Sequence, residues 1–268
     1  MKYLKYLKYL NFFLITLLII IVVYCLLKNN TKKIQLETNN KFKKIAVFTY
    51  NFGNFRDELT TQKIDNFKQF NEFDYYLYTD QNIKSDKWNV IKVPLRPRTP
   101  HMNANRVTSK YYKWKIIPKE LKNYDYILHI DCAKINWLNN ITPKNMYDII
   151  NKYPNVIFFG RKQPVHKNIY EEASSKWHRG EVDDTEYGEN ADKWIKKLKQ
   201  ENFKQKFTHC ETGLHLKKNT KKINNILSKV YDELMINKLC RDQHVFPYVL
   251  QKNNLNINEY KIIDDFSF

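Results

Sequence analysis

The chain has 268 residues, of which 43% are hydrophobic and 15% aromatic, and it carries a formal charge of +18. This is enough apolar material for a sizeable core, and five glycines and eight prolines exclude a linker-rich or repeat-rich chain. Residues 45–268 carry +10 of the charge, which suits a phosphate-bearing ligand or an anionic surface, but no zinc-finger or RNA-binding motif points to a nucleic acid.

The N-terminal segment has the pattern of a membrane anchor. A basic flank at residues 1–8 precedes the almost wholly apolar residues 9–27, which at helical rise span roughly 28 Å, enough for a bilayer core. A cleaved signal peptide is the alternative, but its apolar region would be shorter and would end in small residues. Because lysines precede the span, we expect a single-pass type II protein with a stem at 28–43 and a domain at 44–268.

Strands and helices alternate in the first part of this domain. Apolar, β-branched and aromatic runs predict strands at 45–50, 75–79 and 88–93, and helical spacing predicts a helix at 57–70. A strand, a helix and a further strand in quick succession indicate an α/β sheet.

A basic helix is predicted next, at residues 105–117. Steps of three and four residues place Arg106, Lys110 and Lys113 on one face. These three cations could hold a diphosphate, and a solvated helix face is the alternative.

The stretch from Tyr124 to Ile135 organises the domain. It starts as a buried strand and ends on Asp131, which two small residues follow. Ligands of open α/β sheets bind beyond the carboxyl ends of strands, so Asp131 is placed to meet a metal ion or a polar substrate group. The alternative is an aspartate that caps the next turn. His129, inside the strand, is interpreted as a packed core histidine.

The remaining elements complete an α/β pattern. We predict helices at 143–152, 191–206, 220–238 and 241–250, and a loop that runs into a helix over 160–173. Strands are predicted at 156–159 and 212–216, and a turn-like region at 178–190. Asp242 lies in the first turn of the last helix, where a carboxylate also serves as a cap. Cys132, Cys210 and Cys240 lack metal-type spacing, and nothing requires a disulfide among them.

Four blocks in a fixed order carry a family resemblance. They are Ser109–Lys113 in the basic helix, Ile130–Ala133 at the strand end, His166 with Ile169–Ala173, and Glu211–Leu214 with Arg241–Gln243. Together they resemble a family of GT-A-like glycosyltransferases, mostly membrane-anchored or secretory-pathway proteins, over roughly residues 45–252. The resemblance implies a Rossmann-type mixed sheet flanked by helices and, in a eukaryotic or viral context, a Golgi-like location.

The resemblance also implies how a nucleotide-sugar donor is held. Asp131 would bind Mn²⁺ or Mg²⁺ on the donor diphosphate, since oxygen ligands suit both ions, and Arg106, Lys110 and Lys113 would contact the same diphosphate. In this chain Cys132 and Ala133 replace the family's usual Gly-Asn pair, so Asp131 has no second polar neighbour there. The basic face could then neutralise the diphosphate instead.

For the sugar end, the resemblance singles out two carboxylates, Glu211 and Asp242. One would act as general base on an acceptor hydroxyl and the other would bind donor sugar hydroxyls. His166, Glu172 and Gln243 would line the acceptor side, with a glycan, a protein or a lipid as acceptor.

Two other functions stay open at the level of sequence. A catalytically silent domain of the same fold would bind a glycan or a nucleotide without turnover. A membrane-tethered binder of polyanions would rest on the domain charge alone.

Overall fold

The computed structural model describes residues 16–28, 43–175 and 185–263, and chain contacts divide it into two units, Met1–Lys43 and Lys44–Phe268. In the first unit, residues 16–28 form a helix. The other residues of the expected anchor, 9–15, lie outside the described residues, as do the basic flank and nearly all of the stem. Within the part of the chain that is described, no helix combines the length and the apolar character needed to cross a membrane.

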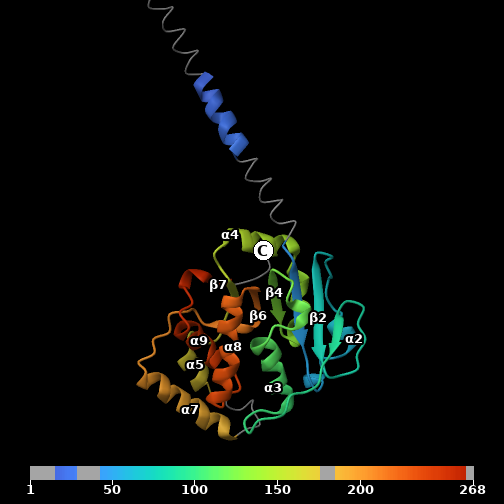
Figure 1. Ribbon diagram of the computed structural model, residues 1–268, viewed down its shortest axis with the longest axis vertical. Helices are drawn as coiled ribbons and strands as arrows, with labels where there is room; N and C mark the ends of the chain where they lie inside the picture. The colour runs from blue at the N-terminus through green and yellow to red at the C-terminus, as the bar shows by residue number, and fades with distance from the viewer. Residues whose placement is uncertain (1–15, 29–42, 176–184, 264–268) are drawn as a thin grey trace, which may run out of the picture. The chain divides into compact units, whose positions relative to one another are not determined.

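A mixed β-sheet forms the centre of the second unit (Figure 1). Its described strands are β1 (Ile45–Tyr50), β2 (Phe73–Thr79), β3 (Asn89–Lys92), β4 (Tyr126–Ile130), β5 (Phe158–Lys162), β6 (Cys210–Lys218) and β7 (Tyr260–Ile263). They lie in the order β3-β2-β1-β4-β6-β5-β7. β6 runs antiparallel to both of its neighbours, whereas the other pairs are parallel. The expectation of an α/β fold with a Rossmann-like mixed sheet is confirmed.

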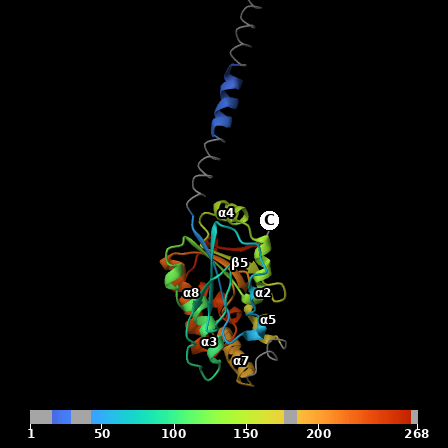
Figure 2. The same cartoon turned by 90° about the vertical axis from the view of Figure 1, so that its right-hand side faces the viewer.

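Helices cover both faces of this sheet (Figure 2). The described α-helices are α2 (Thr61–Ile64), α3 (Ala104–Lys110), α4 (Pro143–Lys152), α5 (Ile169–Ser174), α7 (Thr185–Gln200), α8 (Lys221–Ile236) and α9 (Phe246–Lys252). Side chains of α2 and α4 pack with Val47 and Leu128 in one core, and those of α7, α8 and α9 pack with Phe158 in the other. Because strand side chains alternate between faces, the buried strands supply both cores.

Shorter helical segments join these elements. They are η1 (Phe55–Asp57), the π-helix η2 (Tyr111–Lys115), η3 (Lys119–Leu121), η4 (Cys132–Asn140), η5 (Asp242–His244) and η6 (Ile257–Glu259). The expected helix 105–117 is thus an α-helix that continues as a π-helix. The expected helix 241–250 begins as a 3-10 turn before α9.

The predicted helix at 57–70 is wrong, because only the four residues of α2 are helical there. Side chains from the β3 side take the backbone carbonyl groups that a longer helix would use. Trp88 Nε1 donates to the carbonyl of Ile64 at 2.8 Å, and Lys87 Nζ donates to that of Asp65 at 2.7 Å. Tertiary contacts therefore override the local helical spacing.

Two boundaries and one strand also differ from the prediction. α7 begins at Thr185, inside the region predicted as turn-like, and ends at Gln200. β7 was not predicted, since its four residues form a short strand at the edge of the sheet. Cys25, Cys132, Cys210 and Cys240 are all free thiols.

The carboxyl ends of β1 and β4 lie together at one edge of the sheet because the two strands are parallel neighbours. Asn51 follows β1 and Asp131 follows β4. The antiparallel β6 starts at the same edge, where the Asp131 N–H donates to the Gly213 carbonyl at 2.8 Å. This edge is where open α/β sheets place their ligands.

Candidate functional site

A cavity of about 380 Å³ opens at this edge of the sheet. Five cationic side chains line it, namely Arg56, Arg106, Lys110, Lys113 and Arg241. Three carboxylates line it as well, namely Glu58, Asp131 and Asp242. An excess of cations around a concave site favours an anionic ligand.

The floor of the cavity is an ion cluster centred on Lys113. Lys113 Nζ lies 3.0 Å from Asp242 Oδ2 and 3.6 Å from Asp131 Oδ1. The Lys113 side chain is 2% exposed, and the side chain of Asp131 is 37% exposed. The buried ammonium therefore bridges two carboxylates that come from distant parts of the chain.

Asp242 is held by three donors, all of which contact Oδ2. Besides Lys113, Lys110 Nζ lies 3.2 Å from this oxygen, and Trp114 Nε1 donates to it at 3.0 Å. Burial would raise the pKa of Asp242, but the two lysines and the indole donor hold it well below its usual range. The carboxylate is thus ionised at neutral pH and is a weak base.

The two lysines differ in their pKa. Burial would lower the pKa of Lys113, but Asp131 and Asp242 raise it above its ordinary value. Burial lowers the pKa of Lys110, and the neighbouring Lys113 lowers it further against the attraction of Asp242. Lys113 is therefore a fixed cation, while Lys110 gives up its proton more easily.

The π-helix η2 sets this geometry. It presents Lys113 to the cavity while Trp114 packs beneath, with its ring stacked on His215 at 5.0 Å between centroids. His215 in turn stacks on His129 at 4.8 Å. Burial and the positive charge of Lys113 lower the pKa of both histidines, so they form a neutral aromatic layer under the ions. The interpretation of His129 as a packed core histidine is confirmed.

Gly213 lets the start of β6 pass close to Asp131. A Cβ at Gly213 would lie 2.6 Å from Asp131 Oδ2 and 2.9 Å from Lys134 Nζ. Such contacts are shorter than real Cβ atoms make, so a larger residue would displace the carboxylate. Asp131 is consequently flanked by Lys113 on the side of Oδ1 and by Lys134 on the side of Oδ2.

Glu211 lies outside the cavity lining. It forms ion pairs with both Lys134 and Arg161, and these two cations lie over the ring of Trp137 at 4.6 Å and 4.3 Å. The structure therefore does not bring Glu211 together with Asp242. Its carboxylate belongs to a cluster beside the site.

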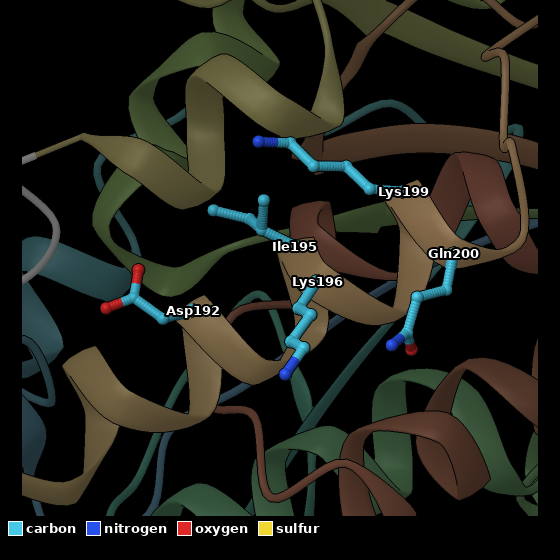
Figure 3. Close-up of a pocket in the computed structure, with 5 residues that line it drawn as sticks. All are labelled: Asp192, Ile195, Lys196, Lys199 and Gln200. Carbon is cyan, nitrogen blue, oxygen red and sulfur yellow. The ribbon is translucent and has the colours of Figure 1, made fainter.

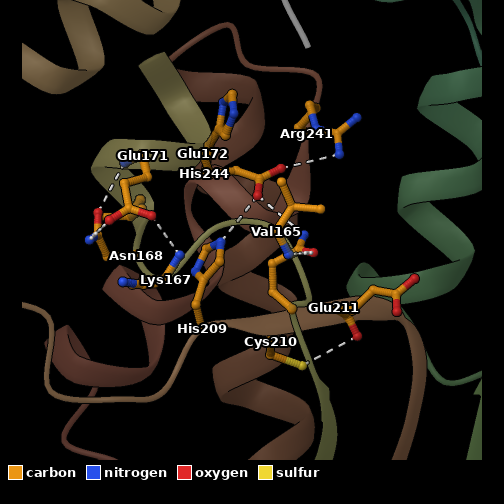
Figure 4. A network of polar contacts seen from close by, with 12 residues as sticks. Val165, Lys167, Asn168, Glu171, Glu172, His209, Cys210, Glu211, Arg241 and His244 are labelled. Atoms are coloured by element: carbon orange, nitrogen blue, oxygen red, sulfur yellow. Dashed lines mark hydrogen bonds and ion pairs between the residues drawn. The ribbon is translucent and has the colours of Figure 1, made fainter. Parts of the chain in front are cut away.

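Glu172 forms a separate buried network (Figure 4). Its side chain accepts from Arg241 Nη2 at 3.2 Å and from Gln163 Nε2 at 3.2 Å, and it lies 3.3 Å from His209 Nε2. Arg241 also lines the cavity, so this network fixes one wall of it. Of the three residues expected on the acceptor side, Gln243 lines the cavity, whereas Glu172 and His166 do not.

Two arginines on the cavity wall form no ion pair within the described part of the chain, although the charge of Arg56 acts on the nearby Glu58 carboxylate. Arg106 lies in the first turn of α3, where Asn103 caps the helix by accepting from the Arg106 N–H at 2.9 Å. Arg56 lies at φ 58° in the left-handed turn after β1, with its guanidinium 4.9 Å from the ring centroid of Phe55. Together with Lys110, they make the anion-facing side of the cavity, which we call the basic wall.

The residues present do not fit a divalent cation at Asp131. Among the described residues, no three His, Cys, Asp or Glu side chains gather as metal ligands do. An ammonium already lies 3.6 Å from Asp131 Oδ1. A divalent ion about 4 Å from that ammonium would be repelled by roughly 8 kcal/mol at an effective dielectric constant of 20. The expected Mn²⁺ or Mg²⁺ stays a prediction to which this geometry gives no support.

Sequence reasoning missed Glu58, which lies just beyond the turn that was predicted after the first strand. Asn51 Nδ2 donates to Glu58 Oε2 at 2.8 Å, which turns the carboxylate into the cavity region beside Cys132. Burial raises the pKa of Glu58 above its ordinary value, against the hydrogen bond from Asn51. Asn51 directly follows the first strand, and this was the available signal, since polar residues at strand ends meet at one edge of the sheet.

A second hollow, of about 470 Å³, lies along α7 (Figure 3). Its lining consists of Asp192, Ile195, Lys196, Lys199 and Gln200, all from one helix face. In Figure 3 these side chains point in different directions and do not converge. The hollow therefore lacks the convergent polar groups of a binding site.

The comparisons with known proteins are sparse. No protein-family model matches the chain, and no curated protein matches it. Among solved structures, a 4-diphosphocytidyl-2C-methyl-D-erythritol synthase from Anaerococcus prevotii aligns over 82% of this chain and 86% of its own, with 11% identity and a TM-score of 0.38. A likeness of this strength carries no argument about activity.

Proposed function

We propose that the chain is a glycosyltransferase whose cavity binds the nucleoside diphosphate end of a nucleotide sugar. The observation that carries the proposal is the basic wall of Arg56, Arg106 and Lys110, in which neither arginine forms an ion pair with another described residue. A diphosphate would supply the missing negative charge through charge-assisted hydrogen bonds. The four sequence blocks that resemble GT-A-like glycosyltransferases support the same ligand.

The sugar would lie over the ion cluster on the floor. Asp131 is partly exposed there, and its carboxylate can accept from a sugar hydroxyl. Asp242 receives its three donors on Oδ2, which leaves Oδ1 to accept from a second hydroxyl. In this proposal Asp242 positions the sugar and does not act as the base, because its pKa is held well below the usual range.

Glu58 is the carboxylate best suited to act as general base. It lines the same cavity, and burial raises its pKa toward the range in which a carboxylate accepts a proton efficiently. The acceptor hydroxyl would give its proton to Glu58 as its oxygen attacks the anomeric carbon, and the nucleoside diphosphate would leave with the bonding electron pair. The basic wall would stabilise the charge that develops on the leaving oxygen.

A panel of nucleotide sugars tests this function. Purified protein should release a nucleoside diphosphate from one of them, slowly with water and faster with a suitable acceptor. Arg106→Ala should lower kcat/KM about tenfold or more, which corresponds to the loss of one charged hydrogen bond. Lys199→Ala, on the α7 hollow, is the matched control and should have no effect. Turnover that Arg106→Ala leaves unchanged would place the donor elsewhere.

A catalytically silent nucleotide-binding domain is the second candidate. It is favoured by the way the two expected catalytic carboxylates are engaged, Asp242 by three donors and Glu211 by Lys134 and Arg161. This candidate predicts nucleoside diphosphate binding without turnover of any donor. Turnover of any donor by the unmodified protein would therefore exclude this candidate. In an active protein, Glu58→Gln should reduce turnover by roughly 10²-fold or more and leave binding intact if Glu58 is the base.

We also propose where the protein is located and which acceptors it meets. The apolar residues 9–27 would anchor the protein as a type II membrane protein, with the catalytic domain on the luminal or outer side. The acceptor would then be a glycan, a protein or a lipid that shares this compartment.

A further inference from the structure

Lys113 occupies an unusual position for a lysine. Its side chain is 2% exposed, it belongs to the π-helix η2, and its ammonium bridges Asp131 and Asp242 on the cavity floor. η2 is the last turn of the helix that begins with α3, and it presents Lys113 to the cavity. A lysine with a purely structural role could form the same ion pairs without lining a cavity, whereas Lys113 lines one.

A divalent cation in a phosphate site has a definable task. It binds protein carboxylates on one side and phosphate oxygens on the other, and so cancels their repulsion. An ammonium with three N–H donors can do the same between two carboxylates and one ligand oxygen. Lys113 already contacts both carboxylates. It also lines the cavity, so its ammonium can reach a ligand oxygen there.

We propose that the Lys113 ammonium takes the place of a divalent cation in this site. The bridged pair of Asp131 and Asp242 therefore binds no Mn²⁺ or Mg²⁺, and an anionic ligand binds without added metal. The identification of that ligand as a nucleoside diphosphate rests on the proposed function, whereas the exclusion of the metal rests on the ion cluster alone.

Two further lysines beside the carboxylates also disfavour a metal ion at this site. Lys134 lies on the Oδ2 side of Asp131, and Lys110 contacts the same Asp242 oxygen as Lys113. Removing Lys113 would leave Asp131 Oδ1 with only the neutral His129 ring, whose Nε2 lies 3.6 Å away, and would leave Asp242 with one donor fewer. Two carboxylates around a vacated ammonium position form the kind of oxygen site that Mn²⁺ accepts.

Titration with Mn²⁺ alone, followed by electron paramagnetic resonance on the full-length protein, tests the exclusion. The unmodified protein should show no Mn²⁺ site that depends on Asp131, so that Asp131→Asn changes nothing. Lys113→Ala should gain one Mn²⁺ site, and the double variant Lys113→Ala, Asp131→Asn should lose it. Lys113→Met, which keeps the length of the side chain, should gain less than Lys113→Ala.

Two results would overturn the inference. One is Mn²⁺ binding by the unmodified protein that Asp131→Asn abolishes. The other is a Lys113→Ala protein with an unchanged circular dichroism spectrum and a cooperative melting transition that gains no Mn²⁺ site. If neither Lys113 variant folds, the comparison of the unmodified protein with Asp131→Asn still decides.

Calorimetric titration with uridine and guanosine diphosphates separates this inference from the proposed function. The unmodified protein should bind one of them with an affinity that changes less than about twofold between EDTA and Mn²⁺, while Lys113→Ala should bind about tenfold more tightly in Mn²⁺ than in EDTA. Tighter binding by the unmodified protein in Mn²⁺ would overturn the inference. Absence of binding under all conditions would contradict the proposed function, and the Mn²⁺ titrations would still decide the role of Lys113.

Discussion

Lys113 Nζ lies 3.0 Å from Asp242 Oδ2, and both side chains are at least 96% buried. The pair joins the π-helix after α3 to the turn before α9, across the edge of the sheet. Because both side chains are almost fully buried, water compensates little for the loss of either charge. The geometry of the cavity floor and the stability of the domain are therefore coupled.

The first prediction concerns this coupling. Asp242→Asn keeps the shape but leaves Lys110 and Lys113 without their shared anion, and it should lower the free energy of unfolding by about 3–5 kcal/mol. Asp232→Asn is the control, because the Asp232 ion pair with Lys115 is only partly buried and should contribute at most about 1 kcal/mol. Urea unfolding of both variants checks the difference. Equal losses would mean that the buried charge of Asp242 contributes no more to stability than a partly exposed ion pair does.

Lys217 supplies a prediction about pH. Burial lowers its pKa to about 7, and no ion pair or hydrogen bond joins its ammonium to another described residue. The unfolded chain keeps this proton until about pH 10.4, so the unfolded state binds more protons between these two values and stability rises with pH across that window. Lys217→Met should be more stable than the unmodified protein below pH 7, and the gain should vanish near pH 10.

Melting temperatures between pH 6 and pH 10 check this, with Lys218→Met as the control. Lys218 is the next residue on β6 and is only partly buried. A gain for Lys217→Met that stays constant with pH would indicate improved packing instead of a removed charge.

Gly213 gives a third prediction. In Gly213→Ala the new Cβ would collide with Asp131 Oδ2 and Lys134 Nζ, so the Asp131 carboxylate should move and ligand affinity should fall about tenfold. Gly188→Ala is the control, since nothing lies within 4 Å of its Cβ position in α7, and it should stabilise the protein by about 1 kcal/mol. Affinity and melting temperature of both variants are the measurements. Unaltered affinity in Gly213→Ala would remove Asp131 from the ligand contacts.

Much of the site could be predicted from local sequence. Asp131 ends a strand whose apolar run is plain, and helical spacing placed Arg106, Lys110 and Lys113 on one face. Both signals are local, because a strand end and a helix face depend on residues close in sequence. The structure brings all four side chains to one cavity.

The partners of these residues could not be predicted. Asp242 meets Trp114 and Lys113 through contacts between distant parts of the chain, and the π-helical turn that aims Lys113 has no sequence signature of its own. Glu211 and Asp242 are equally good candidates for a catalytic carboxylate by sequence, yet only Asp242 lines the cavity. Spacing along the chain cannot separate them, since the difference arises from the packing of β6.

The N-terminal segment yields a fourth prediction, which concerns residues 1–43. The full-length protein should stay in membranes after extraction with carbonate at high pH, because residues 9–27 are long and apolar enough in sequence to span the bilayer. A chain that starts near Lys43 should be soluble and folded, as the contacts of Lys44–Phe268 form a unit of their own. Release of the full-length protein into the supernatant would mean that the segment is cleaved or peripheral.

The most direct test of the whole account is the affinity of the cavity for a nucleoside diphosphate. Calorimetric titration should be made with uridine, guanosine, cytidine and adenosine diphosphates on the unmodified protein, on Arg106→Glu and on Lys199→Glu. We expect one of them to bind, and Arg106→Glu to weaken it about tenfold or more while Lys199→Glu, which makes the same charge change on the α7 hollow, has little effect. Equal losses in the two variants, or no binding by the unmodified protein, would contradict the account.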